Sequence, residues 1–392
     1  MQYLTVAETA DRLGVKRETV YAYASRGLLT SVRSAERRGS RFAQDEVERL
    51  AARGRESGEP SGAVERIRTA ISLLSDDGPF YRGMPAASLP SLEAVAGLLW
   101  ETDPPDLRPD PEREAVARAA LAALPPAARL TDRFRLAVAA QAAVDPLRAD
   151  VSAPAVVRTA ASLLGTTVAA MAPEPPRSRS ATADEPIADR LWPVLGRRPG
   201  PAPRVLGAAL VLLADHGLAA STVAARVAAS TRADVHAVVS AGLGALDGRD
   251  HGLVSSLAHR FLGDARADPV GALAERLRAG EGVPGFGHAV YTGPDPRAVS
   301  LFGLLRDDPA AADVLSTVDA LVGGMARGGA HAPNVDLALA ALSHAYGLRP
   351  DAGEAVFAVA RTVGWVAHAL EEYREPGLRF RPAGVYVGPR PG

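Results

Sequence analysis

The sequence predicts an all-α fold with minor hairpins. Segments rich in Ala and Leu, with apolar residues at helical spacing, follow one another from Val64 onward. Hydrophobic residues make up 47% of the chain and aromatic residues only 5%, so the apolar mass is Ala, Val and Leu, which suits close-packed helices. The 392 residues can bury a large core in two or three domains.

Composition excludes several classes of protein. The net charge of -1 shows no overall bias toward nucleic acid or membrane. The absence of cysteine excludes disulfides, thiolate metal sites and a cysteine nucleophile. The first residues, MQYLTVAETADRLG, are charged and periodic, unlike a signal peptide, and no apolar run reaches the roughly 18 residues of a spanning helix. We therefore expect a cytoplasmic protein with no membrane partner.

Residues 1–52 are predicted to form a separate helix-turn-helix domain. TVAETADRLG opens with a capping box, Thr5 to Glu8, and ends at Gly14. KRETVYAYASRGLL predicts a second helix that ends near Gly27, after a tight turn. SVRSAERRGSRF is typical of a hairpin and AQDEVERLAAR of a further helix. Residues 53–63, which include the polar GRESGEPSG, are predicted to be a linker, and 64–392 a second domain.

The second domain is predicted to begin with a short hairpin, AISLLSDDGPFYRG, whose turn lies at Asp76–Gly78. PEPPRSRSATADEP (173–186) predicts a surface loop. The predicted helices are SLEAVAGLLW, REAVARAALAAL, DRFRLAVAAQAAV, PAVVRTAASLLGTTVAAMA, RVLGAALVLLADHG, STVAARVAAST, DVHAVVSAGLGAL, LVSSLAHRFLGD, VGALAERLRAG, VSLFGLLRD, ADVLSTVDALVGGM, NVDLALAALSHAYG and GEAVFAVARTVGWVAHALEEY.

Three histidines lie beside glycines, at the ends of predicted helices or in loops: His216, His251 and His288. His288 belongs to GVPGFGHAVYTGPDPRA (282–298), which is a poor helix and a poor strand and also holds Arg297. Glycine lets a ligand approach such a histidine closely. The other five histidines lie mostly within helices and are interpreted as structural. No His-x-x-x-His pair or dense carboxylate cluster is present, so we expect no metal site.

Arginines occur in similar places. Arg297 follows Asp-Pro, Arg361 precedes TVGW and Arg381 lies in FRPAG. The planar guanidinium suits bidentate binding of carboxylates. Asp336, in APNVD, begins a predicted helix and is either a functional carboxylate or a first-turn aspartate favoured by the helix dipole.

Taken together, these motifs resemble the citrate synthase family. GFGHAVYTGPDPRA resembles its signature loop, and LLADHGLAASTVAARVAAST, GALDGRDHG, PNVD, VFAVARTVGWVAHALEE and RPAGVYVG follow in the family's order, with FYRG and LEAVAGLLW upstream. The resemblance covers about residues 65–392. It implies an almost entirely α-helical fold in which a large domain and a small one, roughly 253–335 here, close over the active site, and it places the loop of His288 and Arg297 in the cleft between them.

The resemblance also implies roles for the residues that match. Asp336 resembles the base that removes a methyl proton from the acyl-CoA thioester, and His251 the group that hydrogen-bonds the enol oxygen. His288 resembles the donor that polarises the ketone of oxaloacetate. The residues that resemble the carboxylate-binding groups are His216, Arg297, Arg361 and Arg381. The family's counterpart of Arg381 reaches the neighbouring subunit, which implies a homodimer, and the family needs no tightly bound cofactor beyond its acyl-CoA substrate.

Two positions depart from the family pattern. The family has His-Gly-Gly-Ala-Asn or a similar run at the first catalytic histidine, where this chain has HGLVSS. The asparagine of the family's LNAST is Ala220 here. The asparagine side chains that the family has at these two positions would lie near the substrates. Neither change removes a charged catalytic group.

The N-terminal domain resembles the MerR/excisionase type of helix-turn-helix with a wing. The resemblance implies that Lys16, Arg17, Thr19 and Tyr21 start the recognition helix. A basic wing over the DNA phosphates would be formed by four arginines: Arg33, Arg37, Arg38 and Arg41. The alternative is a helical protein-interaction appendage, because residues 1–52 carry nine basic and seven acidic residues.

Two functions from different classes remain. The first is an enzyme that condenses acetyl-CoA or another short acyl-CoA with oxaloacetate to give citrate or 2-methylcitrate and CoA. The second is a transcriptional regulator with a citrate-synthase-like sensor domain. Retention of Asp336, His251 and His288 favours the enzyme, because a sensor has little need of a base.

Overall fold

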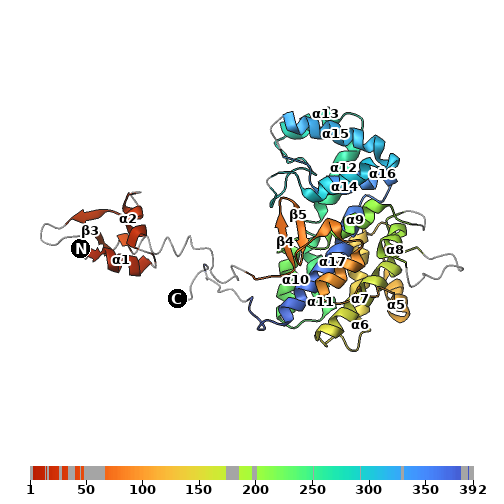
Figure 1. Ribbon diagram of the computed structural model, residues 1–392, viewed down its shortest axis with the longest axis horizontal. Coiled ribbons are helices and arrows are strands. Elements are labelled where there is room, and N and C mark those ends of the chain that lie inside the picture. Colours follow the sequence, from red (N-terminus) through yellow and green to blue (C-terminus); the bar gives the residue numbers. More distant parts are fainter. Residues whose placement is uncertain are drawn as a thin grey trace. The chain divides into compact units, whose positions relative to one another are not determined.

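The computed structural model describes residues 3–13, 15, 17–25, 29–33, 40–44, 46–47, 67–173, 185–196, 201–249, 251–291, 293–327, 331–380 and 387. The chain divides into two compact units, the larger of which comprises Arg68–Arg379 (Figure 1). The predicted boundaries at 52 and 63 lie outside the described residues and remain predictions, as does the linker 53–63. Lys16, Arg37, Arg38 and Arg381 also lie outside them.

The smaller unit has the predicted helix-turn-helix and hairpin. Helices α1 (Val6–Leu13) and α2 (Arg17–Ser25) accompany a three-stranded antiparallel sheet in the order β1-β3-β2, made of β1 (Tyr3–Thr5), β2 (Ser31–Arg33) and β3 (Ser40–Ala43). The predicted capping box is confirmed, because the Thr5 backbone N–H donates to Glu8 over 2.7 Å and the Glu8 N–H donates to Thr5 Oγ1 over 3.3 Å. Its buried core is small and apolar: Ala10, Val20, Leu29, Phe42 and Val47.

The larger unit is mostly helical, as the sequence predicts. A small antiparallel sheet, β4 (Ser72–Ser75), β5 (Gly78–Tyr81) and β6 (Met84–Pro85), confirms the predicted hairpin and adds a third strand. Its helices are η1 (Ala86–Ser88), α4 (Leu92–Trp100), α5 (Pro111–Leu121), α6 (Leu130–Ala143), α7 (Ala153–Met171), α8 (Ile187–Val194), α9 (Arg204–Leu213), α10 (Ala220–Ser230), α11 (Val235–Leu246), α12 (Leu253–Ala265), α13 (Pro269–Arg278), α14 (Pro296–Arg306), η2 (Pro309–Ala311), α15 (Ala312–Arg327), α16 (Val335–Tyr346) and α17 (Ala352–Tyr373).

Helix α17 is the centre of the larger unit. All of its residues from Ala352 to Leu370 are buried. Helices α4, α6, α7, α9, α10 and α11 pack around it, and Figure 1 shows it among them. Trp100 of α4 donates its indole N–H to the carbonyl of Val363 over 2.9 Å. This burial explains the nearly continuous apolar run of α17, because a helix enclosed on every side cannot keep a polar face.

Helices α12 to α16 lie together at one end of the larger unit, drawn in cyan to blue in Figure 1. Helix α12 packs along α16, α13 against α15, and α14 against α16. The predicted small subdomain, roughly 253–335, therefore spans α12 to α15 and ends where α16 begins. Its boundary stays a prediction.

Two features of the helices differ from the sequence-based expectations. Helix α7 is long and apolar enough, by length and composition, to cross a membrane, although no apolar run of that length was expected; 61% of it is buried in the larger unit, as in a core helix of a globular protein. Helix α8 was not predicted, because it is short and contains Pro193 near its end.

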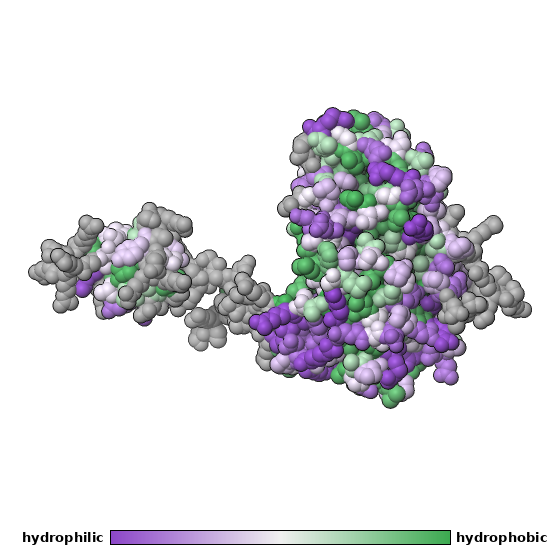
Figure 2. Space-filling model, in the orientation of Figure 1, coloured by the Kyte–Doolittle hydropathy of each residue, from purple (hydrophilic) through white to green (hydrophobic). Residues whose placement is uncertain are grey.

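The visible surface of the larger unit mixes hydrophilic and hydrophobic residues (Figure 2). Among the described residues, Leu73, Leu147 and Leu378 are each more than 60% exposed. Single apolar residues on a surface are ordinary, because polar groups do not suffice to cover a protein.

Candidate active site

The segment that carries His216 is held from several sides. Arg361 donates from Nε to the carbonyl of Leu213 over 2.9 Å. The Tyr81 hydroxyl accepts from the Asp215 backbone N–H, and the Gly217 N–H donates to the Asp215 carboxylate over 2.9 Å. The segment that follows α9 therefore has a fixed path, and His216 on it is 7% exposed.

Asp215 is a buried carboxylate that anchors this segment. It is fully buried, and it contacts the Ser72 hydroxyl and, over 3.2 Å, Nε2 of His368. Burial opposes its charge, but His368, Arg361 and Ser72 hold the pKa of Asp215 below its usual value. Gly364 passes close enough that a Cβ there would lie 2.3 Å from the carbonyl oxygen of Ala214, so only glycine fits.

The glycine-rich loop before α14 is joined to the start of α16. Gly285 and Gly287 have φ of 88° and 82°, which favour glycine. The Asn334 backbone N–H donates to the Gly285 carbonyl, and its side-chain amide donates to the Gly287 carbonyl over 2.8 Å. Asn334 also caps α16 by accepting from the Asp336 N–H. The loop of His288 and the helix of Asp336 are thus one connected piece.

His288 is placed with one ring nitrogen against the backbone. Nδ1 accepts from the N–H groups of Val290 and Tyr291, over 2.9 and 3.3 Å. An accepting nitrogen carries no proton, so the proton of the neutral ring lies on Nε2. Burial first, and then the charge of Arg297, lower the pKa of His288, which favours this neutral form.

Arg297 is not in a loop, as the sequence suggested, but in the first turn of α14. The Asp-Pro-Arg run starts this helix, because Asp295 accepts from the Arg297 backbone N–H and Pro296 takes the first helical position. The Arg297 guanidinium is buried and pairs with Asp295 through Nε, over 3.0 Å, and Nη2, over 2.8 Å.

Arg297 Nη2 also lies 3.1 Å from Nε2 of His288. With the His288 proton on Nε2, the Arg297 guanidinium and the His288 ring are two hydrogen-bond donors side by side. That arrangement suits an acceptor oxygen placed between them.

Asp336 lies in the first turn of α16 and is partly exposed. Desolvation raises the pKa of Asp336 to about 7, against the opposing effect of the Arg297 charge. A carboxylate whose pKa lies near neutrality has the basicity that suits proton transfer at physiological pH.

His251 lies in the turn before α12, and its Nε2 is 2.9 Å from the hydroxyl of Ser221, in α10. Burial and the charge of Arg361 lower the pKa of His251. It is therefore neutral near pH 7, with a ring N–H that can act as a donor.

Arg361 connects these groups electrostatically. It is buried in α17, and its only hydrogen bond among the described residues is the one from Nε to Leu213. Burial lowers the pKa of Arg361, as does the neighbouring charge of Arg297. The guanidinium groups of Arg297 and Arg361 thus lie close enough for their charges to interact. Arg297 forms an ion pair with Asp295, whereas the Arg361 side chain hydrogen-bonds only to a backbone carbonyl among the described residues.

The structure brings most of the predicted site residues together. The rings of His216 and His288 are 5.2 Å apart, and Arg297 contacts His288. The charge of Arg297 acts on Asp336, and that of Arg361 on His216 and His251. Arg381 lies outside the described residues.

Sequence reasoning missed three residues of this site: Ser221, Tyr291 and Asp295. Asp295 was visible in the Asp-Pro-Arg run but was treated as part of a motif rather than as a partner of Arg297. Nothing in the sequence singles out Ser221 or Tyr291, because their partners are far away in the chain or in an irregular loop.

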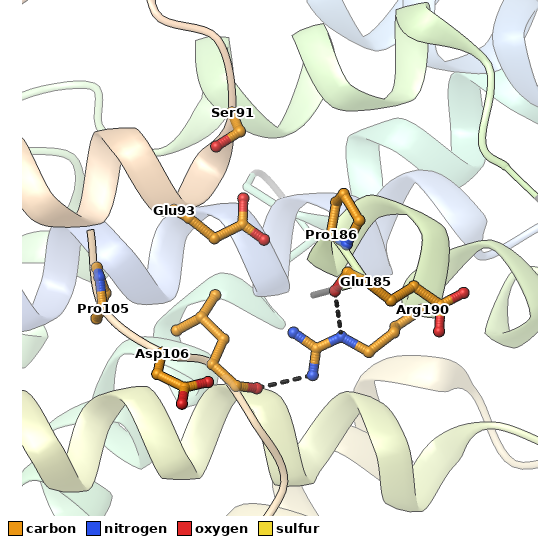
Figure 3. Close-up of a pocket in the computed structure, with 8 residues that line it drawn as sticks. Ser91, Glu93, Pro105, Asp106, Glu185, Pro186 and Arg190 are labelled. Atoms are coloured by element: carbon orange, nitrogen blue, oxygen red, sulfur yellow. Dashed lines mark hydrogen bonds between the residues drawn. The ribbon is translucent and has the colours of Figure 1, made fainter. Parts of the chain in front are cut away.

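A polar cavity of about 260 Å³ lies elsewhere, between the start of α4, residues 105–107 and the start of α8 (Figure 3). Arg190 crosses it and donates to the carbonyls of Leu107 and Glu185, while Glu93 accepts from the Ile187 N–H. These bonds join three segments of chain. The cavity contains none of the candidate catalytic residues.

No group of three or more metal-binding side chains suited to hold an ion occurs in the part of the chain that the structure describes.

In the smaller unit, Tyr21 of α2 is 53% exposed, and Thr19 and Arg41 are partly exposed. The backbone of Arg17 begins α2. The backbone of Arg33 ends β2. With Arg33 included, these are the residues predicted to contact DNA whose places are described.

Comparison with known proteins gives the class of this fold and site. The family described as citrate synthase, C-terminal domain, matches residues 62–383, and a helix-turn-helix domain matches residues 3–55. The 2-methylcitrate synthase of Mycobacterium tuberculosis is 30% identical over 355 residues, which cover 82% of this chain and 88% of that protein. The chain therefore belongs to the citrate synthase family.

Two further similarities are informative. The citrate synthase of Haloferax volcanii is 37% identical over 192 residues, which cover 46% of this chain and 49% of that protein, so the match spans about half of that relative. The citrate synthase of Thermoplasma acidophilum, solved as a ternary complex with carboxymethyl coenzyme A and oxaloacetate, has a TM-score of 0.69 at 23% identity, covering 85% of this chain and 96% of that one. This last likeness shows the fold, and the predicted citrate-synthase-like helical architecture is confirmed.

Proposed function

We propose that the chain condenses a short acyl-CoA, such as acetyl-CoA or propionyl-CoA, with oxaloacetate to give citrate or 2-methylcitrate and free CoA. The observation that carries the proposal is the pair of buried guanidinium groups, Arg297 and Arg361, beside neutral His216 and His288 and a carboxylate, Asp336, whose pKa is about 7. Among the described residues, Asp295 forms an ion pair with Arg297 only, so a dianionic keto-acid can supply the remaining negative charge between the two guanidinium groups, and the carboxylate of Asp336 supplies the base.

In the first step, Asp336 takes a proton from the carbon next to the thioester carbonyl. That proton is weakly acidic, so the charge that develops on the thioester oxygen must be stabilised at the same time. We assign this role to the ring N–H of His251, whose other nitrogen lies on the Ser221 hydroxyl.

In the second step, the resulting enol carbon attacks the ketone carbon of oxaloacetate. His288 points Nε2–H toward the site, where it polarises the ketone and supplies a proton to the developing alkoxide. His216, Arg297, Arg361 and Arg381 hold the substrate carboxylates. Water then hydrolyses the thioester of the condensed product and releases the thiol of CoA.

The direct test is thiol release from acetyl-CoA and from propionyl-CoA, each with and without oxaloacetate. We expect release that depends on oxaloacetate. Release that is equal without oxaloacetate would indicate a simple thioesterase instead. Tight binding of an acyl-CoA with no release would favour the sensor function.

A second function, DNA binding by the smaller unit, is supported by the helix-turn-helix match over residues 3–55 and by the exposed Tyr21 on α2. We propose that α2 contacts base edges while the hairpin of β2 and β3, with Arg41, faces the phosphates. Glu46 anchors this hairpin, because it accepts from the Thr30 N–H and hydroxyl over 2.8 and 2.9 Å.

Removing residues 1–60 is expected to separate the two functions. We propose that 1–52 and 64–392 are independent domains, so a chain that begins at Ser61 should stay folded and release thiol at the full-length rate. Binding to a pool of random-sequence duplex DNA should be lost, while Arg41→Ala in the full chain should weaken it and lower its salt dependence. Inactive or insoluble truncated protein would contradict the boundary.

We also propose that the protein is a homodimer in which Arg381 completes the partner's site. The chain is anchored just before it, because Arg379 pairs with Glu372 over 2.6 and 2.7 Å and Leu378 bonds to Ser230. A two-fold dimer would also present two helix-turn-helix domains to a palindromic site.

Subunit mixing tests the shared site. Chains with Arg381→Ala and chains with Asp336→Asn are each expected to be nearly inactive. A mixed dimer has one site with both residues intact, so activity should return after mixing. No recovery despite proven subunit exchange, or a monomer in light scattering, would contradict the shared site.

A further inference from the structure

The side chain of Tyr291 lies next to both candidate substrate-binding imidazoles, those of His216 and His288. It is 5% exposed, and its hydroxyl oxygen lies 3.1 Å from Nε2 of His216. Its ring is 5.5 Å from the ring of His216 and 4.8 Å from that of His288. The Arg297 guanidinium lies 5.7 Å from the centroid of the Tyr291 ring. Tyr291 therefore lies next to three candidate substrate-binding side chains, although none of the roles proposed above is assigned to it.

Only one proton is available to the His216 ring. Burial, followed by the charges of Arg297 and Arg361, lowers the pKa of His216 far below its usual value, so the ring is neutral. A neutral imidazole carries its proton either on Nδ1 or on Nε2. The direction of the hydrogen bond between Tyr291 and Nε2 decides which of the two it is.

The two directions have different consequences. If Nε2 donated to the tyrosine, the hydroxyl proton of Tyr291 would have no acceptor among the described residues, and a buried unsatisfied donor is costly. Nδ1 would also present a lone pair to an anionic substrate. If the hydroxyl donates to Nε2, the tyrosine is satisfied and Nδ1–H remains free as a donor. No described residue accepts from Nδ1, which leaves it for a ligand.

We propose that Tyr291 is a positioning residue that fixes the tautomer of His216: its hydroxyl donates to Nε2, so that Nδ1–H is presented to a carboxylate of the bound keto-acid. The identity of the keto-acid rests on the proposed function, whereas the tautomer does not. Tyr291 acts through His216 and does not itself touch the reacting atoms.

The same turn fixes the second imidazole by a different route. The backbone N–H groups of Val290 and Tyr291 hold Nδ1 of His288 as an acceptor, which leaves Nε2–H for the substrate. One short segment thus sets both tautomers, one through a side chain and one through the backbone. Replacing the tyrosine hydroxyl alters only the first, and His288 becomes an internal control.

The test is Tyr291→Phe in the full-length protein. Nitrogen-15 NMR of the histidine rings at pH 7, with signals assigned by comparison with His216→Gln and His288→Gln, should show His216 protonated on Nδ1 in the unmodified protein. In Tyr291→Phe, a substantial share of the proton should move to Nε2, while His288 keeps its proton on Nε2. Calorimetry should show oxaloacetate bound about three- to tenfold more weakly, the worth of one neutral hydrogen bond.

Tyr346→Phe is the matched control, because it removes a hydroxyl that bonds to Asp308, away from the site. It should leave the His216 tautomer and oxaloacetate affinity unchanged. A His216 proton on Nε2 in the unmodified protein would overturn the proposal, even if Tyr291→Phe failed to fold. So would a tautomer and an affinity that are both unaffected by Tyr291→Phe. Failure of the proposed function shows differently, as absence of thiol release whatever the tautomer.

Discussion

Replacing Asp336 by Asn is expected to lower oxaloacetate-dependent thiol release by about a hundred- to ten-thousand-fold. The amide keeps the size of the side chain and its place in the first turn of α16, but it cannot accept a proton at neutral pH. The measurement is the turnover rate at saturating substrates. Asp319→Asn is the control and should keep full activity, because Asp319 is an exposed residue of α15 that pairs with Arg306 at the end of α14.

The same residue should set the pH dependence of the unmodified protein. Proton abstraction needs the carboxylate, and desolvation raises the pKa of Asp336 to about 7. The value of kcat/KM for the acyl-CoA should therefore fall about tenfold for each pH unit below 7 and level off above it. A profile that is flat down to pH 5 would contradict the assignment of Asp336 as the base.

Stability measurements separate loss of chemistry from loss of fold. The folded-state pKa of Asp336 lies above its unfolded value of 3.8, so its ionisation destabilises the fold, increasingly as pH rises from about 4 to 7. Asn removes this penalty. The melting temperature of Asp336→Asn should therefore equal or exceed that of the unmodified protein at pH 8. A large fall in melting temperature would mean that the inactive variant is misfolded.

The elements that the sequence predicted best are those set by local rules. The capping box of Thr5 and Glu8 and the turn between β4 and β5 depend on residues a few positions apart. The sequence also predicted α17 as a helix, and its burial emerged only from the structure. Asp336 was placed at the start of a helix from the short APNVD segment, and the structure adds that Asn334 caps this helix.

What the sequence could not reveal depends on contacts between distant segments. The hydroxyl of Ser221 reaches His251 thirty residues later, and that of Tyr291 reaches His216 seventy-five residues earlier. The raised pKa of Asp336 comes from desolvation, which exists only once α16 is packed. Arg297 was assigned to a loop because its neighbours are Gly and Pro, although Asp295 and Pro296 are good residues for starting a helix.

Replacing Arg297 by Ala is expected to weaken oxaloacetate binding by about thirty- to a thousandfold, as for other buried charged partners of an anion. It should also destabilise the protein by about 3–5 kcal/mol, because it leaves a buried carboxylate unpaired. That carboxylate is Asp295, which is 1% exposed and which also accepts from the Val335 N–H at the start of α16 over 3.0 Å. Loss of the arginine thus affects both the ligand and the support of Asp336.

The double variant Asp295→Asn/Arg297→Gln distinguishes these two effects. It removes both charges together, so no buried ion is left without a partner, and the amide oxygen of Asn can still accept from one of the two backbone N–H groups, of Arg297 and Val335, that Asp295 binds. Much of the stability lost in Arg297→Ala should return in thermal or denaturant unfolding. Oxaloacetate affinity, measured by calorimetry, should stay low, because a neutral amide does not replace a guanidinium opposite a carboxylate.

The outcome depends on the pairing of Arg297 with Asp295. In the unmodified protein, Arg297 holds the pKa of Asp295 below its usual value against the effect of burial, so the pair stabilises the fold above the pKa of an unfolded aspartate and loses that effect as pH falls. Arg297→Ala should therefore lose most stability near neutral pH and little in acid. Unchanged oxaloacetate affinity in Arg297→Ala would remove Arg297 from the substrate site. Equal destabilisation in the single and double variants would show that the pair has no electrostatic role in stability.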